Sequence, residues 1–133
     1  MSVVSLYRYC FFRLWQKCSG HDPEGSKHTA VGLLSGLAVL NCCTLLVAAE
    51  IILGRSILPL YPYGALNGLV LYIAFDVAHY IWLARGRELG QVGSEVDGDR
   101  PELLEIGYRL YLVGSPLIFF ALMGLVLALD LYD

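Results

Sequence analysis

Three long apolar runs follow one another along the chain, and polar stretches separate them. The hydrocarbon core of a membrane is about 30 Å thick, and a helix needs about 20 residues to cross it. Three runs have this length, at about 29–53, 63–83 and 110–129. The pattern therefore predicts an all-α membrane protein with three transmembrane helices.

The first 18 residues have a different pattern, in which apolar side chains recur at helical spacing. At 100° per residue they fall within about 140° of arc, with Arg8, Arg13 and Lys17 on the opposite side. The apolar set is Val3, Val4, Tyr7, Cys10, Phe11, Leu14 and Trp15. An apolar face opposite a basic face is typical of a helix that lies in the membrane interface. We expect 1–18 to be such an amphipathic interfacial helix; the alternative is a fourth helix that packs on the protein itself.

Polar segments connect these elements. They are a turn-rich linker at 19–28, a tight external loop at 54–62, a cytoplasmic connection at 84–109 and an external tail at 130–133. Within the connection, a helix is expected to begin near 100, with Asp99 before it and Pro101 in its first turn. This helix is expected to continue unbroken into the third span.

The basic residues that flank the spans are unevenly distributed. Four lie before the first span and four lie in or at the edge of 84–109, whereas the first loop has one and the tail has none. Cytoplasmic segments carry the excess of Lys and Arg. The N-terminus is therefore predicted to be cytoplasmic and the C-terminus external.

Composition supports a membrane location and excludes several functions. The 133 residues are 57% hydrophobic and 16% charged, against about 45–50% and about 25% in an average soluble domain. A net charge of −3 without a basic patch argues against nucleic acid as a partner. The four cysteines, Cys10, Cys18, Cys42 and Cys43, are expected to be free thiols, and no metal or cofactor is predicted.

The second span contains two ionisable side chains. Tyr72, Asp76 and His79 recur at helical spacing and share one face. An isolated charge in the bilayer costs at least about 2.5–3.5 kcal/mol. The cost falls if Asp76 is protonated, if it pairs with His79, or if this face meets another helix, another subunit or trapped water. Two interpretations remain open, a polar clasp between helices and a pathway for protons or ions.

The first span also has a polar face. Gly32 and Gly36 form a GxxxG motif, which allows close approach of a second helix, and Glu50 lies on the same side. Glu50 is expected to reach the external headgroups, where Arg55 could neutralise it. Asn41 lies on the opposite side at mid-depth and needs a partner. Because three spans cannot easily supply every partner, we expect an oligomer or a larger complex.

The third span contains a helix-disrupting sequence, Gly114-Ser115-Pro116. Pro116 removes a backbone donor and clashes with the preceding turn, which predicts a kink. Gly114 and Pro116 are therefore candidate positions for helix packing.

The arrangement of these features resembles a group of short, uncharacterised bacterial inner-membrane proteins with three spans. The residues that carry the resemblance are LYRYCFFRLW near the N-terminus, Leu40, Asn41 and Thr44, the stretch Arg85-Gly86-Arg87-Glu88, and Tyr111 with Ser115. The resemblance covers most of the chain and implies a bacterial inner membrane without an established activity. Asp76 and His79 are not part of the shared pattern, so no functional residue is carried over.

Catalytic motifs such as GxSxG, HExxH and the P-loop are missing from the sequence. An enzyme is therefore not expected. The favoured function is a non-enzymatic accessory or oligomeric component of a membrane complex, in contact with the lipid bilayer and with further copies or other membrane subunits. The alternative is an oligomeric ion- or proton-conducting protein, such as an effector that depolarises the cell, which uses Asp76 and His79.

Overall fold

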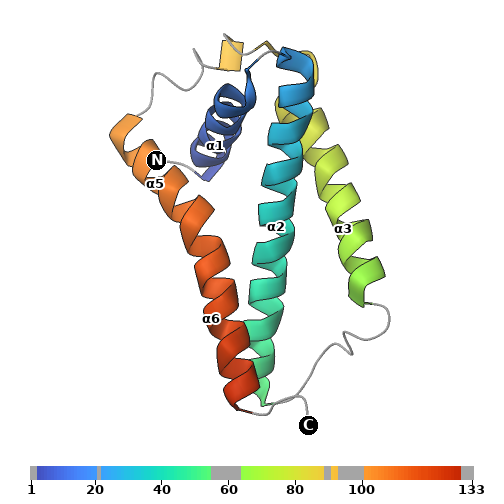
Figure 1. Ribbon diagram of the computed structural model, residues 1–133, viewed down its shortest axis with the longest axis vertical. Coiled ribbons are helices and arrows are strands. Elements are labelled where there is room, and N and C mark those ends of the chain that lie inside the picture. The colour runs from blue at the N-terminus through green and yellow to red at the C-terminus, as the bar shows by residue number, and fades with distance from the viewer. Residues whose placement is uncertain (1–2, 21, 55–63, 89–90, 93–100, 130–133) are drawn as a thin grey trace.

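All regular secondary structure in the described part of the chain is helical. The computed structural model describes residues 3–20, 22–54, 64–88, 91–92 and 101–129 (Figure 1). The helices are α1 (Val3–Cys18), α2 (Pro23–Leu53), α3 (Gly64–His79), α5 (Pro101–Arg109) and α6 (Ser115–Ala128), with π-helical turns η1 (Tyr80–Ala84) and η2 (Leu110–Gly114). Three continuous helical stretches are long and apolar enough to cross a membrane, Glu24–Leu53, Leu66–Ala84 and Glu102–Ala128. The expected all-α chain with three candidate spans is confirmed.

Helix α2 begins six residues earlier than the predicted first span. Asp22 has an extended backbone and its side chain accepts a hydrogen bond from the Glu24 amide at 3.1 Å, which caps the helix. Pro23 occupies the first turn, where its missing amide hydrogen leaves no carbonyl unpaired. The predicted linker at 19–28 was therefore too long, because Asp-Pro-Glu is a helix start as well as a turn sequence.

The far end of α2 has a recognisable stop. Gly54 has φ = 60°, and its amide donates to the Ile51 carbonyl, as is common at helix ends that glycine closes. The helix has 31 residues and is about 46 Å long at 1.5 Å per residue. It therefore exceeds the hydrocarbon core, and its polar first turns extend beyond the apolar part. The rest of the predicted loop 54–62 lies outside the described residues.

The third candidate span is one continuous helix built from α5, η2 and α6. The part from Leu110 to Ala128 has no charged side chain, whereas the α5 part carries several. The expected unbroken passage from the connection into the span is present from Pro101 onward, whereas Asp99 and the tail 130–133 lie outside the described residues. A π-helical turn, η2, ends at Gly114, two residues before Pro116. The wider turn accommodates a residue that cannot donate to the preceding turn.

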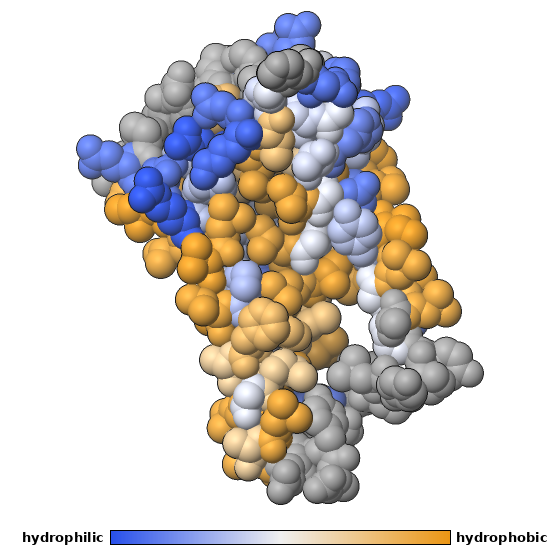
Figure 2. Space-filling model, viewed as in Figure 1, coloured by the Kyte–Doolittle hydropathy of each residue, from blue (hydrophilic) through white to orange (hydrophobic). Residues whose placement is uncertain are grey.

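Helix α2 is central in the fold. Figure 1 shows α3 on one side of α2 and the α5–η2–α6 helix on the other, and both pack against α2. Helix α1 and the start of α2 lie at one end of the bundle, and Figure 2 shows that this end is rich in hydrophilic residues. Below this end the surface is apolar, with exposed residues such as Ile73 and Val77 on α3 and Ile118 and Phe120 on α6. This surface is suited to contact with lipid.

Helix α1 packs on the protein with the face that the sequence assigned to the membrane. Phe11 is fully buried, Cys10 is 1% exposed, and both belong to a core cluster with residues of α2, η1 and α5. Val3 and Val4, at the start of the helix, are exposed. The expected interfacial position is thus corrected. The apolar face of α1 is covered by the other helices of the chain, and not by lipid. The alternative of a fourth packed helix describes α1 better.

Candidate functional site

His79 is held against the central helix by a buried hydrogen bond. It is 6% exposed, and its Nδ1 lies 2.9 Å from Oγ of Ser35 on α2. The serine hydroxyl has one proton, which it donates to the Val31 carbonyl at 2.9 Å. Nδ1 of His79 is then the donor to Ser35. This contact joins α2 to α3, as expected for a polar clasp.

Tyr7 connects the N-terminal helix to this clasp. Its ring stacks on the His79 ring with centroids 5.6 Å apart, and it contacts Trp82 with centroids 6.2 Å apart. Its hydroxyl lies 3.2 Å from the hydroxyl of Tyr111 on η2. The Tyr111 hydroxyl accepts a hydrogen bond from Nδ2 of Asn41 at 3.1 Å. One tyrosine of α1 thereby touches both outer spans, and Asn41 has the partner that its position required.

These contacts correct one step of the argument for an oligomer. His79 and Asn41 obtain their partners within the chain, from α2 and η2. Tyr7 of α1 adds a ring contact to His79 and a hydroxyl contact to Tyr111. The demand for an external partner is therefore confined to fewer residues.

Asp76 differs from the other polar residues of the spans. In the described part of the chain its carboxylate has no hydrogen bond or ion pair, and its side chain is half-buried. The pair with His79, one of the three ways of lowering the cost named above, is not among the described ion pairs, and the imidazole donates to Ser35 instead. A Cβ atom placed on Gly32 would lie 3.0 Å from the Tyr72 hydroxyl and 3.8 Å from Oδ1 of Asp76. Tyr72 and Asp76 thus lie together against α2, as their shared face predicted.

The GxxxG motif is used at only one of its two positions. Gly32 allows the close approach of Tyr72 to α2, since a side chain there would crowd the Tyr72 hydroxyl. A Cβ atom on Gly36 or on Gly114 would have nothing within 4 Å in the structure. Neither Gly36 nor Gly114 therefore meets another described helix of the chain closely, and their role in helix packing stays a prediction.

Glu50 is also placed differently from the expectation. It is 3% exposed, so it lies inside the protein instead of reaching toward headgroups. Val47, one turn earlier on α2, and Val126 of α6 are buried as well, and these two helices pack together. The proposed partner Arg55 lies outside the described residues.

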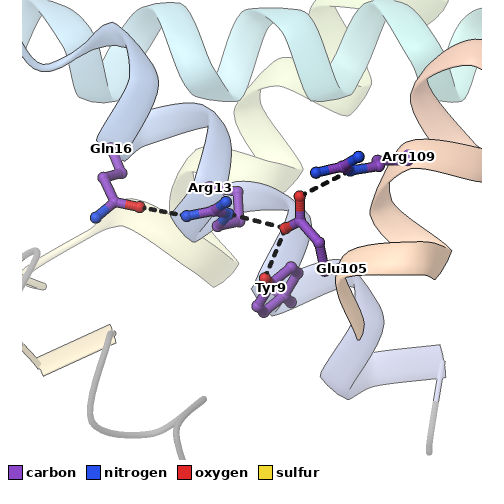
Figure 3. A network of polar contacts seen from close by, with 5 residues as sticks. All are labelled: Tyr9, Arg13, Gln16, Glu105 and Arg109. Carbon is purple, nitrogen blue, oxygen red and sulfur yellow. Dashed lines mark hydrogen bonds and ion pairs between the residues drawn. The ribbon is translucent and has the colours of Figure 1, made fainter. Parts of the chain in front are cut away.

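A second polar network joins α1 to α5 at the hydrophilic end of the bundle (Figure 3). Glu105 accepts hydrogen bonds from the Tyr9 hydroxyl at 2.8 Å, from Nε of Arg13 at 3.1 Å and from Nε of Arg109 at 3.0 Å. These hydrogen bonds, of which the one from Tyr9 has the largest effect, hold the pKa of Glu105 well below its usual range, at about 2. Glu105 precedes the uncharged length of the third span, and its network joins α1 to this end of the helix.

The sequence revealed this network only in part. Glu105 and Arg109 are four residues apart on one helix, a spacing that indicates an ion pair. Tyr9 and Arg13 are more than 90 residues away, and no local spacing connects them with Glu105. Among the contacts described earlier, Tyr111 could have been found as a candidate partner of Asn41, because a buried hydroxyl in an apolar span must be hydrogen-bonded.

The described residues offer little for a metal or for nucleophilic chemistry. Among them, no three His, Cys, Asp or Glu side chains converge as metal ligands would. Cys10 is buried in the core, and burial raises the pKa of its thiol to about 12, which makes it unreactive. The polar contacts among the described residues join helices together, and even the Ser35 hydroxyl beside His79 is directed to the Val31 carbonyl.

Comparisons with protein-family models, with curated proteins and with solved structures give no match to this chain. Its function is therefore inferred from the residues and their geometry alone.

Proposed function

We propose that the protein is a non-enzymatic component of a membrane complex, which binds other membrane subunits or further copies through its spans. The observation that carries this proposal is the state of Asp76. Two hydrogen bonds pair the other polar residues across helices, one between Ser35 and His79 and one between Asn41 and Tyr111. Asp76 has no such bond within the described residues. A carboxylate in a span that lacks a partner in its own chain favours a partner from another chain.

The location belongs to the same proposal. The described basic residues lie on α1, in the first turns of α2, just after η1 and on α5. These elements meet at the hydrophilic end of the bundle, which supports a cytoplasmic position for that end. The C-terminus is then external. The resemblance described above supports a bacterial inner membrane as the location.

Proton or ion conduction is the alternative. It would need polar side chains along the whole depth of the bilayer. The described polar contacts instead run across the bundle, from α2 to η1 and from α2 through η2 to α1. Below Asp76, the exposed side of α3 carries Val70, Ile73 and other apolar residues. This arrangement favours a binding role over a conduit.

The test is the mass of the protein taken from its own membrane into nanodiscs without prior detergent exchange. The protomer has a mass of 14.7 kDa. We expect a protein mass of at least twice this value, and we expect Asp76→Leu to reduce the share of the larger species. Val77→Ala, a change at a neighbouring lipid-exposed position, is the matched control and should leave that share unchanged. A single protomer in every nanodisc would contradict the proposal.

A further inference from the structure

A polar seam runs along the contact between α2 and α3. We define it by Gly32 and Gly36 on α2 and by Tyr72 and Asp76 on α3. Gly32 borders the Tyr72 hydroxyl and Oδ1 of Asp76, and the space beside Gly36 is open. In Figure 2, hydrophilic and pale residues continue from the charged end down over the upper parts of α2 and α3, between apolar surfaces. The seam is therefore a polar break in the surface that faces lipid.

Asp76 lies too deep in the seam for its carboxylate to reach water easily. It is eight residues before Ala84, where η1 ends, which corresponds to about 12 Å along the helix. The aspartate side chain is short, and helical side chains point toward the helix N-terminus, which for α3 is the end away from the charged surface. The carboxylate is thus directed deeper into the bilayer, and lipid offers it no donor.

From this we infer that the polar seam is the docking surface for a transmembrane helix of another protein that carries a Lys or Arg side chain at the depth of Asp76. The inference rests on the proposed function and names the chemistry of the partner. Charge complementarity selects a basic helix, because charged residues inside membranes pair with opposite charges. The open flank of Gly36 supplies the room for a helix backbone to approach closely.

A second copy of the chain fits the seam less well. A symmetric pair that meets at this seam would bring two Asp76 carboxylates together at equal depth, and like charges repel strongly where water is excluded. Within the described residues of α3, Asp76 is the one charged side chain between Gly64 and His79. A second α3 therefore offers no cation for it.

The test uses model transmembrane peptides in vesicles of dioleoyl phosphatidylcholine, a lipid without net charge. Three leucine–alanine peptides differ only in their central residue, which is Arg, Leu or Asp. Binding is followed by energy transfer between a fluorophore on the peptide and one on Cys18 of the full-length protein. We expect half-saturation with the Arg peptide at about a tenth of the peptide-to-lipid ratio that the Leu peptide needs. The Asp peptide should bind no better than the Leu peptide.

Substitutions locate the binding on the seam. Asp76→Asn should reduce the preference for Arg severalfold, and Asp76→Leu should remove it. Gly36→Leu should weaken binding of the Arg peptide, because the added side chain blocks the approach. Gly124→Leu is the matched control: Gly124 on α6 also has nothing within 4 Å of an added Cβ, and this change should leave binding intact.

Several results would overturn the inference. They are equal binding of the three peptides, a preference for Arg that survives Asp76→Leu, and an equal loss in the two glycine variants. Energy transfer between two labelled copies that Asp76→Leu abolishes would assign the seam to self-association instead. If the peptides bind equally but nanodiscs still contain a larger species, the seam inference fails and the proposed function stands; a single protomer in the nanodiscs would reject the proposed function itself.

Discussion

Removal of the Phe11 side chain should release α1 from the bundle, and the protein contains a natural reporter of this event. Phe11 is fully buried in the cluster that joins α1 to α2, η1 and α5, with its ring 5.4 Å from that of Trp15. Its neighbour Cys10 is 1% exposed, and burial raises the pKa of the Cys10 thiol to about 12. With the other three cysteines replaced by alanine, a maleimide can label the protein only when α1 leaves its site.

Phe11→Ala leaves a cavity in a closely packed region, and such substitutions cost about 3–5 kcal/mol. Labelling that depends on a rare open state follows the population of that state. At about 1.4 kcal/mol for each factor of ten, the labelling rate of Cys10 should rise at least about 100-fold. The rate is measured in nanodiscs by mass spectrometry of quenched samples. The labelling rate of an unfolded control peptide sets the upper limit that the Cys10 rate can reach.

Val3→Ala supplies the comparison that separates the two positions considered for α1. Val3 is 77% exposed, so its truncation should change the labelling rate less than about twofold. If α1 lay in the membrane interface, Val3 and Phe11 would both contact lipid and both substitutions would matter to a similar degree. Equal effects of the two, or rapid labelling of Cys10 in the protein with native Phe11, would refute the docking of α1 on the bundle.

Three further predictions concern the polar contacts. The carboxylate of Glu105 stabilises the fold above its ordinary pKa of 4.5, and this contribution is lost as the pH falls toward about 2; thermal unfolding followed against pH should show the loss, and Glu105→Gln should lack it. Ser35→Ala removes the acceptor of His79 and should lower the free energy of unfolding in mixed micelles by about 0.6–2 kcal/mol; no change would contradict the clasp. Tyr111→Phe leaves Nδ2 of Asn41 unpaired and should cost about 1–3 kcal/mol in the same assay, so an unaltered unfolding curve would show that this bond contributes little.

The spans were predictable from sequence because their apolar length is a local property. Each run only had to be long enough to cross the hydrocarbon core, and all three candidate spans are present as helices. The start of α2 was missed by six residues because Asp22 and Pro23 favour a turn as well as a helix cap, and local pattern alone does not separate the two.

The sequence could predict which polar side chains need a hydrogen-bond partner, but not which residue that partner is. The sequence shows that Asn41 and His79 need partners in an apolar environment. Which residues serve as partners depends on how the helices cross: Tyr111 is 70 positions from Asn41, and Ser35 is 44 from His79. The position of α1 was undetermined for a related reason, since an amphipathic face is equally suited to lipid and to a neighbouring helix.

The most direct test of the central claim, that the polar residues of the spans serve binding and not conduction, is proton flux through the purified protein in liposomes. We predict that the protein dissipates an imposed proton gradient no faster than protein-free vesicles over a range of voltage and pH, and that Asp76→Asn and His79→Ala change nothing. A gradient that collapses with the wild-type chain, and more slowly with both variants, would contradict the account.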